Sequence, residues 1–244
     1  MSKAAKVWLM IAAVLVLTGS GLFVGVMCKL NWDFSKLSTV KYIRNSHEIS
    51  QSFDRISVDT EEADVRFVLS EDGRCRVECR EEEKAIHTVT VRDGTLKITV
   101  DNQKRWYDYI GIDAFCAPQI TVYLPETEYI SLLVWGETGD VEIFGDFFFR
   151  EVEIAVDTGD LTLKDVVAEQ TIMLETNTGD IRLEGCDAAE LSLETDTGDI
   201  SGSLLTEKIF LTEVSTGDVQ VPKTTTGGVC SAKTDTGDID ITIS

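Results

Sequence analysis

The stretch Thr195-Asp196-Thr197-Gly198-Asp199-Ile200 (TDTGDI) decides the fold of this chain of 244 residues. Its central Thr-Gly-Asp motif occurs six times, at spacings of 20, 20, 19, 19 and 20 residues. The six copies begin at Thr138, Thr158, Thr178, Thr197, Thr216 and Thr236. Self-similarity at a fixed period of this length is typical of proteins built from stacked coils.

Each copy of the motif lies between two segments that have the alternation of a β-strand. In the fourth copy, Leu191, Leu193 and Thr195 precede the motif at every second position, and Ile200 follows it. A period of two predicts strands with one buried face, and the glycine between them supplies the positive φ of a bend. The sequence therefore predicts an all-β fold, a parallel β-solenoid (β-helix) with coils of 19–20 residues.

The chain upstream of the repeats carries weaker signals of the same kind. The segment ISVDTEEADVRF (56–67) has the strand–bend–strand form without the glycine, and QITVYLP (119–125) is a strand stopped by proline. Asp93-Gly94 between two alternating segments is a hairpin signal. We expect one β-solenoid domain over residues 53–244, with an irregular first part (53–135) and regular Thr-Gly-Asp repeats (136–244).

The N-terminal end is apolar. Residues 7–28 (VWLMIAAVLVLTGSGLFVGVMC) carry no charge over 22 positions, and at ~1.5 Å per residue they span a hydrocarbon layer of about 30 Å. We expect a single transmembrane helix in a membrane anchor (1–29), followed by a tether (30–52). A cleavable signal peptide is the alternative, because Thr18-Gly19-Ser20 offers small residues.

The orientation of this anchor is not settled by its flanking charges, because lysines lie on both sides of the apolar segment. Long following domains translocate largely regardless of charge, so we expect a single-pass protein of the cell membrane with its C-terminal domain extracytoplasmic. One observation opposes this orientation. Five cysteines lie beyond the anchor and cannot all pair, which favours a compartment that is not strongly oxidising.

The formal net charge of −21 limits the kinds of partner. Nucleic-acid affinity comes mainly from phosphate neutralisation by Lys and Arg, so a chain this acidic is not expected to bind nucleic acid. A protein or glycan at the cell surface is the expected partner, besides the membrane contacted by residues 7–28. An aromatic cluster at 106–115 offers candidate contact residues, namely Trp106, Tyr107, Tyr109 and Phe115.

Asp-Thr-Gly is also the loop of aspartic proteases, which need two such carboxylates sharing one proton. Here the position before Thr-Gly is occupied by Glu, Asp, Asn or Ser in different copies, and neither Asn nor Ser is an acid. The residue present in all six copies is the aspartate after the glycine. The motif is therefore predicted to be a structural bend, and we expect no catalytic residue and no enzyme activity.

The repeated aspartates are predicted to stack along one edge of the solenoid. At ~4.8 Å, neighbouring carboxylates repel by roughly 0.9 kcal/mol in water, which turn hydrogen bonds of about 1 kcal/mol each offset. Carboxylate and carbonyl oxygens are also ligands for Ca²⁺, so a weak calcium site is the one cofactor considered, although we expect a structural bend. The residues concerned are Asp140, Asp160, Asp180, Asp199, Asp218 and Asp238.

The six cysteines and two histidines do not form a metal motif in the sequence. No CxxC occurs, and neither His47 nor His87 has a cysteine or histidine at ligand spacing, so zinc is not expected. Cys75, Cys79 and Cys230 occupy inward strand positions, where thiols act as small apolar residues.

An N-terminal anchor, the strand ending in Tyr123-Leu124-Pro125 and the Thr-Gly-Asp repeats together resemble the bacterial putative-adhesin family of β-strand-repeat domains of unknown function. The resemblance covers residues 53–244. It implies a β-helical surface domain and supplies no catalytic residues. We expect a non-enzymatic, membrane-anchored surface protein for adhesion or protein contact. A sensor of envelope stress that binds a membrane partner, and a polysaccharide-acting β-helix enzyme, are the alternatives.

Overall fold

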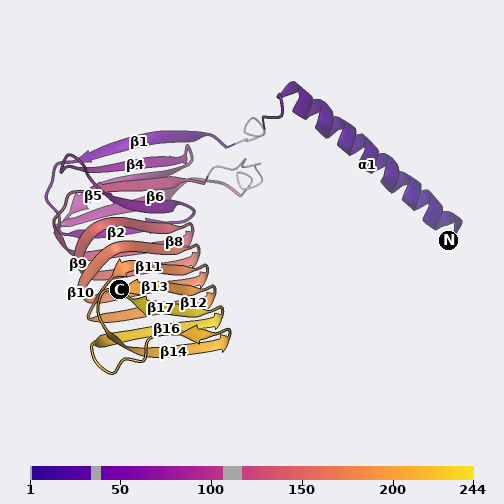
Figure 1. Ribbon diagram of the computed structural model, residues 1–244. Helices are drawn as coiled ribbons and strands as arrows, with labels where there is room; N and C mark the ends of the chain where they lie inside the picture. Colours follow the sequence, from indigo (N-terminus) through magenta and orange to yellow (C-terminus); the bar gives the residue numbers. More distant parts are fainter. Residues whose placement is uncertain (1, 34–39, 107–116) are drawn as a thin grey trace. The chain divides into compact units, whose positions relative to one another are not determined.

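A computed structural model describes residues 2–33, 40–106 and 117–244 (Figure 1). Helix α1 (Lys3–Lys29) begins after Ser2, whose hydroxyl oxygen accepts a hydrogen bond from the Ala5 amide. Its segment Ala5–Lys29 has a mean hydropathy of 2.3 and is long and apolar enough to cross a membrane. A signal sequence near an N-terminus meets the same criterion.

The remaining elements are all β-strands. They form a compact unit of residues 42–104 and 117–244, called the body below. The strands are β1 (Tyr42–Ile49), β2 (Arg55–Thr60), β3 (Asp64–Leu69), β4 (Cys75–Glu82), β5 (Ala85–Arg92), β6 (Thr95–Asn102), β7 (Gln119–Leu124), β8 (Glu128–Thr138), β9 (Val141–Thr158), β10 (Leu161–Thr178), β11 (Ile181–Cys186), β12 (Glu190–Thr197), β13 (Ile200–Leu204), β14 (Lys208–Thr216), β15 (Val219–Gln220), β16 (Gly228–Thr236) and β17 (Ile239–Ile243).

Successive repeats stack with their strands parallel and in register, in two walls (Figure 1). The first wall holds the strands that precede each bend, and equivalent inward residues pair from repeat to repeat: Leu132, Val152, Ile172, Leu191, Cys230 and Phe210. The second wall holds the strands that follow each bend, with the series Val65, Val141, Leu161, Ile181, Ile200, Ile239 and Val219. One strand pair joined by a bend is called a coil below.

The inward residues of both walls meet in one continuous core. Side chains such as Val58, Leu132, Ile154 and Leu174 from the first wall have at most 1% of their surface exposed. Phe67, Ile143 and Leu161 from the second wall are completely buried. A row of parallel coils can share one core in this way because a single coil cannot bury its own apolar face.

The body begins with antiparallel strands. β1 pairs with β4, and β4 with β7, while β5 and β6 form a hairpin closed by Asp93 and Gly94, both at positive φ, as the sequence predicts. The tether expected at 30–52 is a point of difference, because β1 lies inside it. Its inward positions include Asn45 and His47, which are half-buried. Polar residues at these positions remove the alternation of apolar and polar residues that would have predicted a strand.

The last two coils do not stack in chain order. β16 pairs with β12 on one side and with β14 on the other, so the coil β16–β17 lies between the coils β12–β13 and β14–β15. Pro222 follows β15, which is only two residues long. Proline cannot donate to a strand ladder and is confined to edges, so the coil that contains it suits the end of the stack.

An ion pair links the outer coil, β14–β15, to the segment that precedes β12. Lys208, at the start of β14, is 3% exposed, and its Nζ lies 2.5 Å from Asp187 Oδ1, in the turn before β12. The same ammonium donates to Thr206 Oγ1 at 2.6 Å. The Lys208–Asp187 pair therefore reaches across the level of the inserted coil.

Candidate functional site

The Thr-Gly-Asp bend requires glycine for two reasons. All six glycines of the motif have φ between +140° and +156°, a region that residues with a side chain rarely occupy. Each one also lies against the backbone of the neighbouring coil. A Cβ placed on Gly198 would stand 2.0 Å from the Gly179 carbonyl oxygen, and one on Gly237 would stand 2.0 Å from that of Gly198.

The aspartates that follow these glycines form one hydrogen-bonded series. The backbone amide of Asp160 donates to Asp140 Oδ1 at 2.8 Å, and the same bond recurs from each coil to the next. The series runs in the spatial order Asp64, Asp140, Asp160, Asp180, Asp199, Asp238 and Asp218. The six predicted aspartates are thus brought together, with Asp238 before Asp218. Asp64, at the bend between β2 and β3, is a member that the motif search missed because Ala63 replaces the glycine.

These hydrogen bonds explain how the ladder tolerates its charge. One oxygen of each accepting carboxylate is held by a backbone amide, a bond to a charged acceptor worth about 1.5–3 kcal/mol. Arg182 spans two rungs, with Nη1 3.0 Å from Asp160 Oδ2 and Nη2 beside Asp180 Oδ2. Burial raises the pKa of Asp64 above its usual value, against the lowering effect of the Asp140 amide. The ladder is therefore satisfied by protein groups, and the expectation of a structural bend rather than a calcium site stays a prediction.

The predicted aromatic contact residues fall mostly outside the described part of the chain. Tyr107, Tyr109 and Phe115 lie there, whereas Trp106 is described and 76% exposed. A second aromatic group, at 147–149, belongs largely to the core, where the Phe147 and Phe149 rings are 5.9 Å apart and buried.

The described cysteines of the body are buried free thiols. Burial raises the pKa of Cys75 and Cys230 to about 12 and that of Cys186 to about 11. Thiols in this state are poor nucleophiles and resist oxidation, because the thiolate is the reactive form. Cys28 on α1 is exposed, and Cys116 lies outside the described residues.

A buried polar cluster near the start of the body was not found from the sequence. Ligand atoms of Cys79, Glu81 and His87 all lie within 4.8 Å of one another, and the three residues are 1%, 1% and 4% exposed. Cys79 thus lies close to His87 in space, although the two residues are not at ligand spacing in the sequence. Cys79 and Glu81 share the inward face of β4, and His87 comes from β5 after a short turn.

Hydrogen bonds define the geometry of this cluster. Glu81 Oε2 accepts from the His87 amide at 2.6 Å and lies 2.8 Å from His87 Nδ1. Glu81 Oε1 accepts from Asn45 Nδ2 of β1 at 2.6 Å. On the other side of the ring, His87 Nε2 lies 3.1 Å from Thr60 Oγ1 of β2. The cluster therefore joins four strands, β1, β2, β4 and β5.

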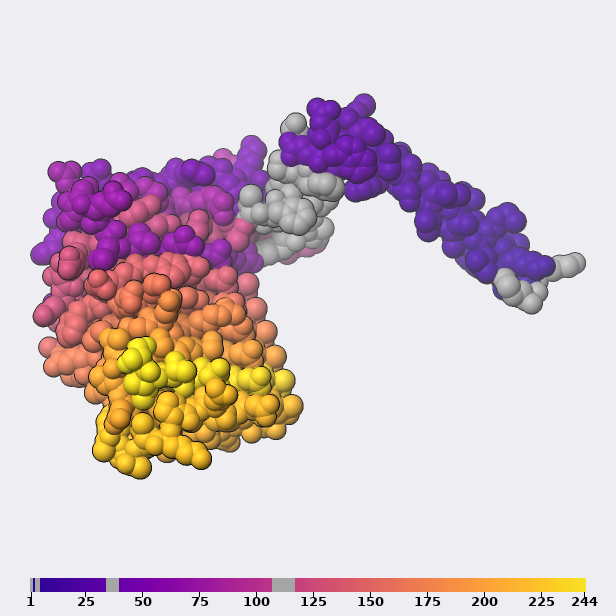
Figure 2. Space-filling view, viewed as in Figure 1, coloured from indigo at the N-terminus to yellow at the C-terminus, as the bar shows by residue number. Residues whose placement is uncertain are grey.

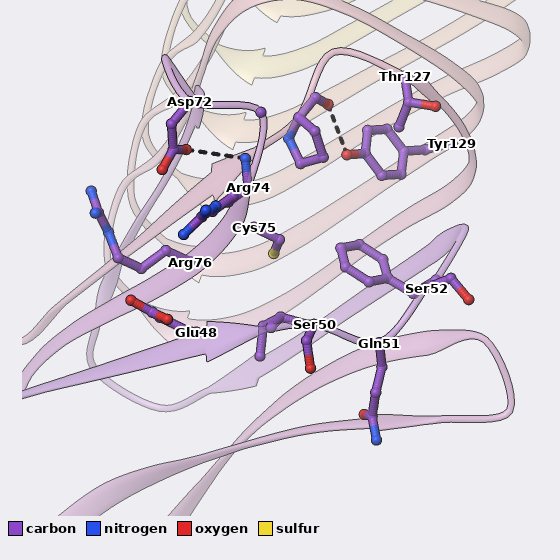
Figure 3. Close-up of a pocket in the computed structure, with 14 residues that line it drawn as sticks. Glu48, Ser50, Gln51, Ser52, Asp72, Arg74, Cys75, Arg76, Thr127 and Tyr129 are labelled. Atoms are coloured by element: carbon purple, nitrogen blue, oxygen red, sulfur yellow. Dashed lines mark hydrogen bonds between the residues drawn. The ribbon is translucent and has the colours of Figure 1, made fainter.

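A pocket of about 480 Å³ is lined by the ends of β1 and β4 and by the turns beside them (Figure 3). Phe53, Cys75 and Tyr129 give it apolar walls, and Arg74 and Arg76 lie at the side formed by β4 and the preceding turn. The Tyr129 hydroxyl donates to the Pro125 carbonyl at 2.9 Å, and the Arg74 amide donates to Asp72 at 3.0 Å. These polar groups are thus already engaged within the protein.

Solved structures with a similar fold include a putative cell adhesion protein from Clostridium sporogenes, with a TM-score of 0.51 and 9% identity over 84% of this chain and 100% of that one. A putative adhesin from Bacteroides fragilis has a TM-score of 0.43 and 18% identity over 84% and 97% of the two chains. No curated protein matches the chain. At these identities the likeness concerns the fold. The Toastrack DUF4097 family model matches residues 53–244, so the chain belongs to the Toastrack DUF4097 family.

Proposed function

We propose that the chain is a non-enzymatic, membrane-anchored surface protein, and that its body is an acidic β-solenoid that binds a basic segment of another protein. Helix α1 would anchor the chain in the cell membrane, with the body on the extracytoplasmic side. The parallel register of successive coils supports the solenoid, and the apolar composition of α1 supports the anchor. The unpaired cysteines do not oppose this location, because the described body thiols are buried and a buried thiol resists oxidation.

The observation that carries this proposal is the open end of the stack at β14–β15. Within the described residues, β14 pairs only with β16 and β15 only with β17, so the outer strand edges have no partner. Several apolar side chains are exposed around this edge, namely Leu205, Ile209, Leu211 and Val219, at 38–57% of their surface. An unpaired edge with apolar side chains is a template for an added strand.

The charge distribution indicates what kind of strand would fit. Residues 117–244 hold 6 Lys/Arg and 26 Asp/Glu, a net of −20, whereas residues 42–104 hold 10 and 14, a net of −4. The open end lies in this part of the chain, which is coloured orange to yellow in Figure 2. Residues 205–223 at the end itself hold 2 Lys/Arg and 3 Asp/Glu, a net of −1, and the coils behind them carry the rest of the negative charge. A second copy of this chain would be repelled, and a basic, extended segment would be attracted. The description of the similar C. sporogenes protein as a cell adhesion protein agrees with a contact function.

A binding measurement tests the contact site. The full chain in detergent micelles is titrated with a fluorescent peptide of alternating Lys and Val, and with a matched peptide of Glu and Val. We expect binding of the first peptide only. The double variant Ile209→Lys/Leu211→Lys should weaken it about tenfold, or about 1.4 kcal/mol.

The control variant Trp135→Lys/Met173→Lys adds the same charge at exposed apolar positions on the first wall, at 48% and 45% exposure. Equal weakening by both double variants would mean that the peptide is held by net charge alone and would overturn the edge site. Protease treatment of intact cells tests the location separately: digestion of the body only after lysis would contradict surface display.

A further inference from the structure

We infer that Cys79, Glu81 and His87 form a binding site for a divalent transition metal of the zinc type, which would use their thiolate, carboxylate and imidazole nitrogen. The site lies at the opposite end of the body from β14–β15 and does not depend on the proposed function. Ligand atoms of the three side chains already lie within 4.8 Å of one another, close enough to converge on one ion after a small shift.

The ligand set determines the class of metal. Thiolate and imidazole are preferred by Zn²⁺ and its transition-metal neighbours, whereas Ca²⁺ and Mg²⁺ prefer all-oxygen sites. Three protein ligands of this kind, with a fourth position left for water or another group, are a familiar zinc arrangement. The aspartate ladder considered for calcium is therefore a different site, because it lies at the Thr-Gly-Asp bends and offers only oxygen ligands.

The charge of the cluster also fits a divalent ion. A thiolate and a carboxylate buried together would repel each other, and two negative charges without a partner are costly in a protein interior. A bound Zn²⁺ neutralises both, so the loaded site of thiolate, carboxylate and neutral imidazole has no net charge. Binding of the ion displaces the thiol proton of Cys79, which is released to solvent.

The surrounding hydrogen bonds have the form of a supporting shell. Thr60 Oγ1 lies 3.1 Å from His87 Nε2, where it can accept the ring proton and leave Nδ1 free to bind the ion. Asn45 holds Glu81 Oε1 at 2.6 Å, which leaves Oε2 directed at the imidazole. Such partners fix the orientation of ligands, and their removal typically lowers metal affinity 10–100-fold.

A second histidine lies on the same side of the body. His47 is two residues from Asn45 on the inward face of β1, and its ring Nε2 is enclosed without a hydrogen-bond partner in the described part of the chain. Both histidines of the protein are thus found in the first strands of the body. Strand β1 pairs only with β4 among the described residues, so its separation from β4 would give an ion access to the cluster.

The test uses the full chain in detergent micelles, reduced and freed of metal. It is titrated with Co²⁺, whose thiolate charge-transfer absorption reports a Co–S bond, and then with Zn²⁺ in competition. We expect one Co²⁺ per chain with that absorption, its displacement by Zn²⁺, and a rise in melting temperature with Zn²⁺. Cys79→Ser should abolish the absorption and lower Zn²⁺ affinity on the order of a hundredfold.

Matched controls separate this site from other thiols. Cys230→Ser removes another completely buried cysteine, at a distant coil, and should change neither the absorption nor the affinity. Thr60→Val should weaken Zn²⁺ binding about tenfold and keep the Co–S absorption, because it removes only the support of His87. An absorption that survives Cys79→Ser, or the absence of any absorption in the unsubstituted chain, would overturn the proposal. Cys79 takes no part in the Glu81–His87 hydrogen bonds, so its variant tests the site without removing that pair.

Discussion

The bend glycine Gly198 offers the sharpest test of the coil geometry, through the substitution Gly198→Val. Its φ of +154° costs a β-branched residue about 1–3 kcal/mol in strain. The new Cβ would also stand 2.0 Å from the Gly179 carbonyl oxygen, which belongs to the backbone and cannot rotate away. Relief of this contact displaces the hydrogen bonds from Gly179 N to Thr197 O and from Gly198 N to Thr236 O, each worth about 1 kcal/mol.

The expected loss is therefore about 3–5 kcal/mol, which lowers the melting temperature by roughly 6–20 °C for a chain of this size. Circular dichroism of the full chain in detergent measures it. Gly73→Val is the matched control, because Gly73 has a φ of +69° and open space around it, so that only backbone strain remains. Asp196→Ala, at an exposed position beside the bend, should cost less than about 0.5 kcal/mol. Equal melting shifts for Gly198→Val and Asp196→Ala would refute the role assigned to the bend glycine.

Three further outcomes are expected. Millimolar Ca²⁺ should raise the melting temperature no more than NaCl at the same ionic strength. A true calcium site would add about 2.7 kcal/mol to the free energy of unfolding at a hundredfold excess of Ca²⁺ over its Kd. A larger Ca²⁺ shift that disappears in Asp180→Asn would assign calcium to the ladder. Asp64→Asn should stabilise the body at neutral pH. Burial raises the pKa of Asp64, so the folded state loses stability as the pH rises from the unfolded pKa through the folded one, and asparagine removes this loss. If the difference in melting temperature between the two proteins is the same at pH 3 and at pH 7, the reasoning is wrong. In a Cys116→Ser background, a thiol reagent at pH 8 should label Cys28 in the native protein and the four buried cysteines only after unfolding. Mass spectrometry measures the labelling. Modification of Cys75 or Cys230 in the native protein would contradict the burial of these thiols.

Most of the repeat architecture could be predicted from the sequence because its signals are local. The inward alternation at Leu191, Leu193 and Ile200 and the glycine of each bend act within one coil, and the parallel pairing follows from their repetition. The order of the last two coils in the stack is not determined by signals within one coil. Leu191 and Leu193 pair with Cys230 and Ala232, which come about 40 residues later in the chain, and not with Phe210 and Thr212 of the next coil. Pro222 is the residue in the sequence that indicates this order, because a proline in a strand segment favours a position at the edge of a sheet.

The buried cluster was missed for a different physical reason. The alternation of CRVECREE continues to Glu81, so a charged residue at an inward position was visible in the sequence. Its partners come from three other strands, and Asn45 lies in a segment with no apolar pattern. Polar contacts between strands depend on register, which alternation alone does not supply.

The exchanged order of the last two coils has a consequence for how the chain reaches its native state. In an ordinary repeat array each new unit can dock on the one synthesised before it. Here β14 and β15 have no docking surface of their own until β16 and β17 have emerged, because those strands lie between them and β12–β13. During synthesis the segment 208–220 therefore emerges before the strands with which it pairs in the native state. The Lys208–Asp187 ion pair links the start of this segment to a coil made earlier, so that the outer coil is tied to the body across the strands that are synthesised last.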